Sequence, residues 1–229
     1  MDILGALRRL CDNGVRLAVA SGRDPESLRR LLLPLGRPVS VIAHDGALAL
    51  EDGRAVYRRP IEAEAVRAFC RMDDNRGRTL LFYGENEVLI RRGGGDREAE
   101  QDAGLPVTEI KSEYAIRTPI YKIAAYGPRG GRPMAKPAAL RPTGRDAAVE
   151  EYVCAYVNKG TALSDLQLRH HLTVFDTAVA GDGRADLPLF ARAADSFAPS
   201  DAPESIRSAA KQTGELSDFL WELVKTTQK

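Results

Sequence analysis

The sequence predicts an α/β fold in which a parallel-sheet core is interrupted by an inserted α+β segment. A strand, a helix and a strand follow one another with short polar loops over residues 15–43, and the same pattern resumes from residue 152. Between these stretches, helical and strand-like runs alternate with glycine- and proline-rich segments, which favours an insertion. We therefore expect a core domain of residues 1–51 and 152–229 and a second domain of residues 52–151.

The amino-terminal elements follow from hydrophobic spacing. Apolar residues recur at helical spacing over residues 3–11, and residues 15–20 read as a short buried strand. Asp24-Pro25 has the residue types of an N-cap and a first helical position for a helix over residues 26–35. Residues 39–43 are expected to form the next strand.

The predicted insertion contains a helical stripe over residues 61–70 and strand-like runs over residues 80–83, 88–90 and 120–126. This mixture indicates antiparallel strands packed with a helix.

The core pattern resumes with an apolar run over residues 152–157, a helix from Thr161 and a strand over residues 177–180. The loop Gly181-Asp-Gly-Arg-Ala-Asp186 follows, and a helix is expected over residues 187–193. This loop places two carboxylates at the carboxyl end of a strand, where α/β sheets bind ligands. Such an oxygen-rich site suits Mg²⁺.

Composition excludes several classes of function. The 229 residues are 44% hydrophobic and 28% charged with a net charge of +1, so no bulk field favours nucleic acid or an anionic membrane. Cys11, Cys70 and Cys154 lie far apart, without zinc spacing or a disulfide framework. No run approaches the roughly 20 apolar residues that span a bilayer, and no signal peptide is recognisable. We expect a soluble cytoplasmic protein with no nucleic-acid or membrane partner.

Four loops follow predicted core elements at the end of the sheet where ligands bind. They contain Ser21-Gly22-Arg23, His44-Asp45-Gly46, Asn158-Lys159-Gly160, and Asp182 with Asp186. The Ser21 hydroxyl and the Gly22 amide can donate to a phosphoryl oxygen. Lys159 beside a helix N-terminus would add a charge to this phosphate cradle.

Each loop also has a purely structural interpretation. Ser21-Gly22 would be a helix-entry loop, and Lys159 a solvated surface lysine. Asp182-Gly183 would be an ordinary turn, with Asp186 as the N-cap of the following helix.

The ordered set of loops resembles the haloacid dehalogenase superfamily, in particular its Cof-type sugar-phosphatase branch. The resemblance rests on Ala18–Arg23, Ile42–Leu48, Asn158–Leu163 and Gly181–Asp186. It implies a Rossmann-like three-layer core with an inserted α+β cap of the C2 type. It also implies Mg²⁺-dependent hydrolysis of a small phosphorylated metabolite through an aspartyl-phosphate.

The resemblance assigns roles to individual side chains. The resemblance implies that the substrate is bound by Ser21, Gly22, Arg23, Asp45 and Lys159. Ser21 and Lys159 would also stabilise phosphoryl charge during catalysis. Asp182 would ligate Mg²⁺ directly, and Asp186 would ligate it or orient a coordinated water.

The sequence also departs from the family's pattern. The family begins with a strand carrying Asp-X-Asp-Gly-Thr, whose first aspartate is the nucleophile, and the printed chain contains no such motif; Val174-Phe-Asp-Thr177 lacks the second aspartate. Ala185 and Asp45 stand where the family has asparagine. We therefore expect the first core strand to be missing and the printed chain to be inactive, through a truncated start or through degeneration. Loss of this first core strand would leave backbone donors and acceptors unpaired on the strands that end at Ser21 and Gly181, or it would force those two strands to pair directly.

Two other functions stay open. A non-catalytic phosphate- or phosphosugar-binding module would bind its ligand without turnover. A phosphomutase of the same superfamily would yield an isomer instead of free phosphate. Candidate cap contacts with substrate are the loops at residues 83–85 and 114–121.

Overall fold

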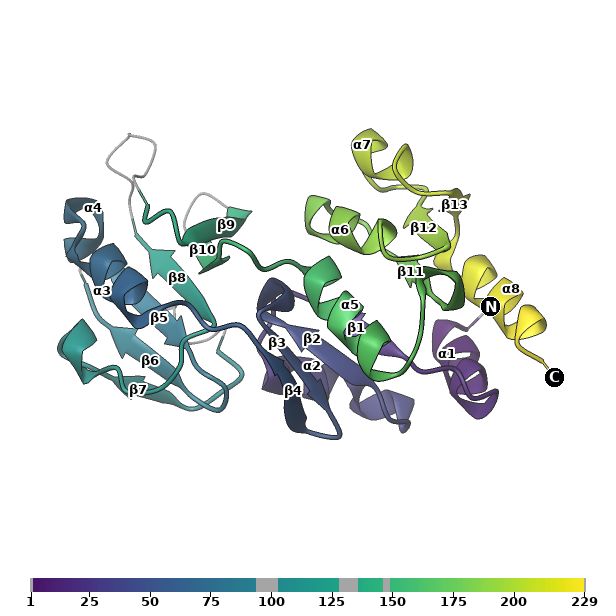
Figure 1. Ribbon diagram of the computed structural model, residues 1–229, viewed down its shortest axis with the longest axis horizontal. Coiled ribbons are helices and arrows are strands. Elements are labelled where there is room, and N and C mark those ends of the chain that lie inside the picture. Colours follow the sequence, from purple (N-terminus) through teal and green to yellow (C-terminus); the bar gives the residue numbers. More distant parts are fainter. Residues whose placement is uncertain (1, 94–102, 128–135, 146–148, 229) are drawn as a thin grey trace.

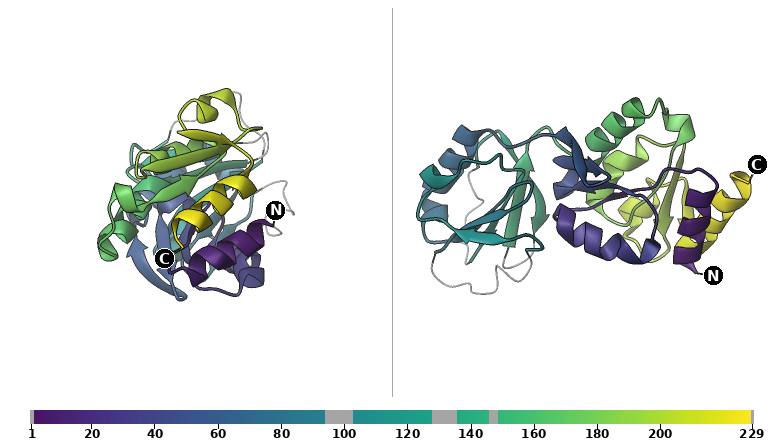
Figure 2. Two further views of the ribbon diagram at one scale, coloured as in Figure 1. Left: turned by 90° about the vertical axis from the view of Figure 1, so that its right-hand side faces the viewer. Right: turned by 90° about the horizontal axis from the view of Figure 1, so that it is seen from below.

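The computed structural model describes residues 2–93, 103–127, 136–145 and 149–228, and its strands form separate sheets in two lobes (Figure 1). We call residues 2–58 and 158–228 the inner lobe and residues 59–157 the outer lobe. Both termini lie at the end of the inner lobe that faces away from the outer lobe (Figures 1 and 2).

The amino-terminal half of the inner lobe is built on a sheet of order β1-β2-β3-β4. Its elements are α1 (Ile3–Asp12), β1 (Ala18–Ala20), α2 (Pro25–Leu32), η1 (Leu33–Leu35), β2 (Ser40–Ala43), η2 (His44–Gly46), β3 (Leu48–Glu51) and β4 (Arg54–Arg58). β1 is parallel to β2, whereas β2, β3 and β4 are antiparallel. The predicted strand–helix–strand unit is confirmed, with Asp24 as N-cap and Pro25 as the first residue of α2.

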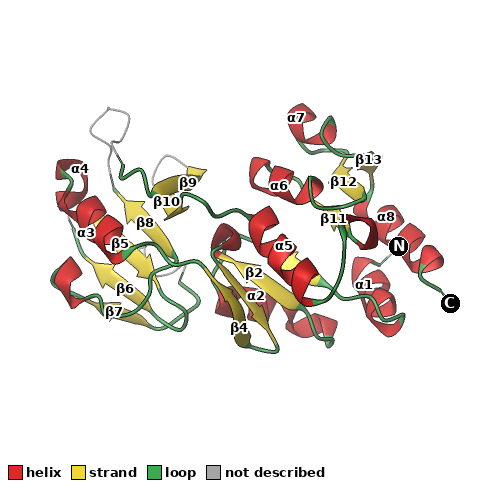
Figure 3. Ribbon diagram, viewed as in Figure 1, coloured by secondary structure: helices red, strands yellow, loops and turns green. Residues whose placement is uncertain are grey.

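The carboxyl-terminal half has a second, fully parallel sheet of order β11-β12-β13. Its elements are α5 (Lys159–Arg169), η4 (Val174–Asp176), β11 (Ala178–Ala180), η5 (Arg184–Asp186), α6 (Leu187–Phe190), β12 (Asp195–Pro199), α7 (Glu204–Arg207), β13 (Gln212–Gly214) and α8 (Leu216–Thr226). α5 packs its buried Ala162 and Leu166 against Ile42 of β2, so this helix joins the two halves (Figure 3). α1 packs against α8 through a cluster that includes Leu10 and Phe219.

β1 and β11 each end a sheet, since β1 pairs with β2 alone and β11 with β12 alone in the described part of the chain. The amide of Ser21 donates to the Ile42 carbonyl, and the amide of Gly181 donates to the Phe197 carbonyl. In β1 and in β11, the backbone groups of alternate residues therefore point toward the paired strand, and those of the residues between them point away from it. A cavity of about 530 Å³ lies between these edges and is lined by residues of both strands. We call this cavity the inter-sheet slot.

The outer lobe contains a sheet of order β7-β6-β5-β8-β10-β9. Its elements are α3 (Ala63–Arg71), α4 (Asp73–Arg76), β5 (Thr79–Tyr83), β6 (Val88–Arg91), β7 (Val107–Glu109), η3 (Glu113–Ala115), β8 (Lys122–Tyr126), β9 (Leu140–Arg145) and β10 (Val149–Cys154). β5 is antiparallel to both β6 and β8, as predicted, and Phe69 of α3 packs against Phe82 of β5. Figure 3 shows α3 lying across this sheet.

The strand pairings assign some residues to a different lobe from the one that the hydrophobic pattern suggests. The apolar run over residues 152–157 was expected to begin a core strand, but residues 149–154 form β10, which pairs antiparallel with β8 and β9. Residues 54–58 form β4 in the inner sheet. No helix among the described residues is long and apolar enough to cross a membrane.

Candidate functional site

The loop that follows β1 is held on both sides by backbone hydrogen bonds. The Ser21 carbonyl accepts from the Asp45 amide at 3.0 Å, and the Arg23 carbonyl accepts from the His44 amide at 3.0 Å. The Ser21 Oγ accepts from the Arg23 amide at 3.3 Å. Asp24 then caps α2 by accepting from the Ser27 amide at 2.9 Å. The loop Ser21–Asp24 therefore has a defined conformation, which we call the β1 loop.

Three consecutive residues in the left-handed region connect the β1 loop to α5. His44, Asp45 and Gly46 have φ values of 50°, 52° and 98° and are all buried. A Cβ on Gly22 would lie 2.9 Å from Asp45 Oδ2, and a Cβ on Gly46 would lie 2.2 Å from the carbonyl oxygen of Asn158. Such strained backbone persists where the surrounding structure requires it, and it often marks a functional site.

Lys159 and Asp186 form a buried ion pair at the end of the inter-sheet slot. The Lys159 Nζ lies 2.7 Å from Asp186 Oδ1, and each side chain is only 10% exposed. The second carboxylate oxygen of Asp186 accepts from the amides of Asp182 and Gly183 at 3.1 Å. Asn158 and Thr161 form a capping box that fixes the start of α5. The pair thus joins α5 to the loop after β11.

Asp186 and Asp182 have different environments. Asp186 occupies the N-cap position of α6, as the structural interpretation expects, but its side chain makes no capping hydrogen bond to that helix. Both of its oxygens are engaged by Lys159 and by the loop amides instead. Asp182 is exposed, and its carboxylate makes no hydrogen bond or ion pair with the described residues. Across the described residues, no group of three or more His, Cys, Asp or Glu side chains is arranged to hold a metal ion.

The predicted loops form one continuous line of contacts. The β1 loop contacts Asp45, Gly46 contacts the start of α5, and Lys159 contacts Asp186, whose carboxylate binds the amide of Asp182. The Arg23 side chain is exposed and makes no polar contact with described residues. The structure therefore brings together the loops that the sequence singled out, and Arg23 lies at their surface.

Two cations from the outer lobe also reach this region, although no motif in the sequence pointed to them. The Lys122 Nζ donates to the Gly22 carbonyl at 2.8 Å. The Arg141 guanidinium donates to the Val157 carbonyl at 2.6 and 2.9 Å. Burial lowers the pKa of Arg141, and the nearby charge of Asp45 opposes this shift. A lysine inside the apolar run 120–126 was an available signal, because buried lysines are rare unless paired.

The His44 ring lies between the lobes, next to two tyrosines of the outer lobe. Its centroid is 5.6 Å from that of Tyr83 and 6.4 Å from that of Tyr121. The ring is fully buried, and neither nitrogen has a hydrogen-bond partner among the described residues. Burial, with the charge of Lys122, holds the pKa of His44 well below its usual value. Tyr83 and Tyr121, in the loops expected to contact substrate, are thus packed against a neutral histidine.

Comparisons with known proteins agree with this architecture. A family model described as haloacid dehalogenase-like hydrolase matches residues 3–131 and 148–218. No curated protein matches the sequence.

Several solved structures share the fold at low identity. A protein from Eubacterium rectale is 21% identical with a TM-score of 0.85, over 98% of this chain and 90% of that one. The phosphatase BT1666 from Bacteroides thetaiotaomicron is 21% identical with a TM-score of 0.76, over 98% and 86%. The subclass IIB sugar phosphatase BT4131 is 16% identical with a TM-score of 0.73, over 96% and 90%. At these identities the similarity shows the fold.

Proposed function

The chain belongs to the haloacid dehalogenase-like hydrolases, and from that premise we propose that it is the scaffold of a phosphatase for small phosphomonoesters, sugar phosphates in particular. The inner lobe would be the catalytic core, and the outer lobe would be the cap that selects the substrate. The observation that carries this proposal is the line of contacts from the β1 loop through Asp45 and Lys159 to Asp186 and Asp182.

The residues of this line suit the recognition of a phosphoryl group. The Ser21 hydroxyl and the Gly22 amide would donate to phosphoryl oxygens, with Arg23 at the open side. The ammonium of Lys159 has three donors, of which Asp186 uses one. The other donors would bind a phosphoryl oxygen and offset the charge that it gains as the ester bond breaks.

Mg²⁺ fits this site through Asp182. In proteins this ion is usually held by one or two carboxylates together with substrate phosphate and water, and the Asp182 carboxylate has no competing partner among the described residues. Asp186 would orient the loop and coordinated water, because both of its oxygens are already engaged. Bound Mg²⁺ would offset negative charge on the phosphoryl group.

The reaction also needs a nucleophile, and we propose that no carboxylate among the residues that the structure describes fills that role. Asp176, the aspartate of Val174-Phe-Asp-Thr177, binds the hydroxyl and amide of Thr173 in a capping box at η4. We propose that the hydrolytic form contains one more strand, carrying Asp-X-Asp-Gly-Thr. Its aspartate would form the bond to phosphorus as the substrate alcohol leaves, and water would then cleave the aspartyl-phosphate.

The inter-sheet slot supports this additional strand. The slot is lined by Ala18 and Ala20 of β1 and by Ala178 and Ala180 of β11, whose backbone groups point away from their paired neighbours. A strand parallel to both edges would satisfy these groups. Asp186 also lines the slot, so such a strand would end beside the candidate site.

Two forms of the protein test the proposal. One is the printed 229-residue chain; the other adds, in frame, the residues encoded directly upstream of Met1. We expect the printed chain to bind inorganic phosphate in calorimetry without releasing phosphate from sugar phosphates. Phosphate-ester hydrolysis can require rate enhancements of up to about 10²¹-fold, which binding groups alone do not supply. We expect the longer form to show turnover that Asp182→Ala abolishes.

Each other outcome identifies a different function. Turnover by the printed chain that Asp182→Ala abolishes would show that the nucleophile lies within it. Phosphate binding without turnover in both forms would indicate a binding module. An isomeric product without free phosphate would indicate a phosphomutase. If neither form binds phosphate, the phosphatase proposal is wrong.

A further inference from the structure

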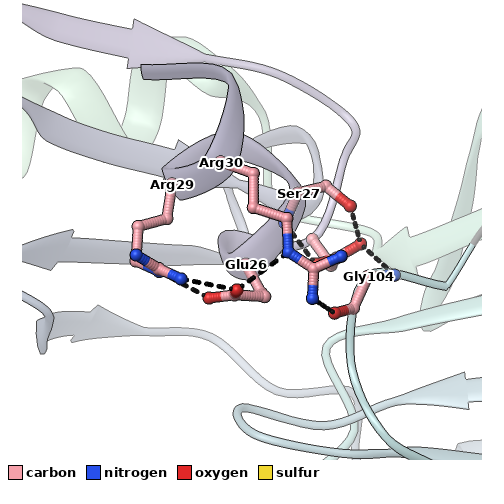
Figure 4. Close-up of polar contacts among 6 residues, drawn as sticks. Glu26, Ser27, Arg29, Arg30 and Gly104 are labelled. Carbon is pink, nitrogen blue, oxygen red and sulfur yellow. Dashed lines mark hydrogen bonds and ion pairs between the residues drawn. The ribbon is translucent and has the colours of Figure 1, made fainter. Parts of the chain in front are cut away.

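Described residues of the outer lobe form hydrogen bonds with the β1 loop at two points. At the first, Lys122 of β8 donates to the Gly22 carbonyl across 100 residues of sequence. At the second, Gly104 donates its amide to Asp24 at 3.1 Å and accepts from Arg30 at 3.3 Å (Figure 4). Both contacts depend on the outer lobe being seated on the inner lobe. Only the first touches the peptide groups next to Ser21.

The environment of Lys122 fixes its ammonium in place. The side chain is 5% exposed, and its Nζ lies 2.7 Å from Glu151 Oε1 and 4.6 Å from the centre of the Tyr83 ring. The carboxylate and the ring face stabilise the buried charge from two sides. The Gly22 carbonyl is therefore held by a cation whose own position is determined by the outer lobe.

This contact is transmitted to Ser21 through a single peptide unit. The Gly22 carbonyl and the Arg23 amide belong to the same planar peptide, so the direction of one determines the direction of the other. That amide donates to Ser21 Oγ at 3.3 Å. A hydrogen bond from a cation to the carbonyl also polarises the peptide, which strengthens the donation by its N–H.

We propose that Lys122 is a positioning residue that couples seating of the outer lobe to phosphoryl binding by Ser21. Because Ser21 Oγ accepts from the Arg23 amide, its own proton points elsewhere and is free for a phosphoryl oxygen. If the outer lobe separated from the inner lobe, Lys122 would leave the Gly22 carbonyl and the Ser21 hydroxyl would lose its fixed orientation. This inference rests on the role proposed above for Ser21.

The test compares Lys122→Met with Lys122→Arg and with Arg30→Met, which removes an inter-lobe hydrogen bond away from Ser21. Calorimetry measures the affinity for inorganic phosphate, and NMR measures hydrogen exchange of the Arg23 amide. We expect Lys122→Met to weaken phosphate binding about 10-fold and to accelerate exchange by a similar factor. The phosphate affinity of Lys122→Arg should stay within about 3-fold of that of the unmodified chain, and the phosphate affinity of Arg30→Met should stay within about 2-fold. If Lys122→Met does not fold, Lys122→Gln replaces it.

A second background separates positioning from general stability. In Ser21→Ala protein, Lys122→Met should change phosphate affinity by less than about 2-fold, because the hydroxyl that it positions is gone. An equal loss in both backgrounds, or a loss with Arg30→Met as large as with Lys122→Met, would overturn the inference. If the unmodified chain binds no phosphate, the proposed function fails, while unchanged Arg23 exchange in Lys122→Met would refute the coupling by itself.

Discussion

Removal of the Asp186 carboxylate should destabilise the inner lobe strongly. In Asp186→Ala, the Lys159 ammonium would remain in a position where its side chain is only 10% exposed, without its partner at 2.7 Å. Removal of one member of a buried pair costs about 3–5 kcal/mol, because the remaining charge is uncompensated. The amides of Asp182 and Gly183 also lose their acceptor, but these hydrogen bonds are only partly buried, so water reduces that cost. We therefore expect a loss of about 3–5 kcal/mol in the free energy of unfolding.

Urea unfolding followed by circular dichroism measures this loss, and thermal unfolding should show a decrease of about 6–20 °C in Tm. Asp182→Ala is the matched control, because it removes a carboxylate four residues away that is exposed; it should change stability by about 0.5 kcal/mol or less. Lys159→Met combined with Asp186→Asn should be less destabilising than the sum of the two single changes. A cost below about 1 kcal/mol for Asp186→Ala, or equal costs at Asp182 and Asp186, would refute this account of the ion pair.

Two further predictions concern the turn between β2 and β3. The lowered pKa of His44 means that the unfolded chain binds a proton more readily than the folded chain. Stability should therefore fall below about pH 6.5, by up to about 1.4 kcal/mol per pH unit, and His44→Phe should flatten this slope in urea unfolding at pH 5 to 8; an unchanged slope would exclude His44 as its source. Gly46→Ala should cost more than Gly36→Ala, because both glycines have positive φ but only Gly46 would place a Cβ against backbone. Gly36→Ala should cost about 1 kcal/mol in urea unfolding, and equal losses for the two variants would contradict the proposed clash.

Local signals in the sequence were sufficient for some inner-lobe elements, such as α1, α2 and β2, whereas β3 and the elements after α6 were not predicted. Asp24 and Pro25 predicted the start of α2 because capping depends on neighbouring residues alone. The pairing partner of a strand cannot be predicted in this way, because an apolar run indicates a strand but does not indicate which other strand it pairs with. Residues 152–154 were therefore expected in the core, although β10 pairs with β8 and β9 in the outer sheet.

The same distinction applies to the candidate site. Ser21, Lys159 and Asp182 follow predicted strands or begin a predicted helix, so their loops could be selected from the sequence. The pairing of Lys159 with Asp186 and the reach of Lys122 to Gly22 join positions that are 27 and 100 residues apart. These contacts depend on how the sheets and lobes pack, and residue spacing does not encode that packing.

The packing of α1 against α8 has a consequence for how the chain folds. The Asn13 side chain donates to the Val224 carbonyl across 211 residues, so this contact forms only after the whole intervening chain has been synthesised. The strands of the outer lobe are contiguous in sequence and close much shorter loops, which favours their earlier folding. Until α8 arrives, the apolar face of a newly made α1 has no permanent cover. During synthesis it is therefore a candidate binding site for chaperones and a starting point for aggregation.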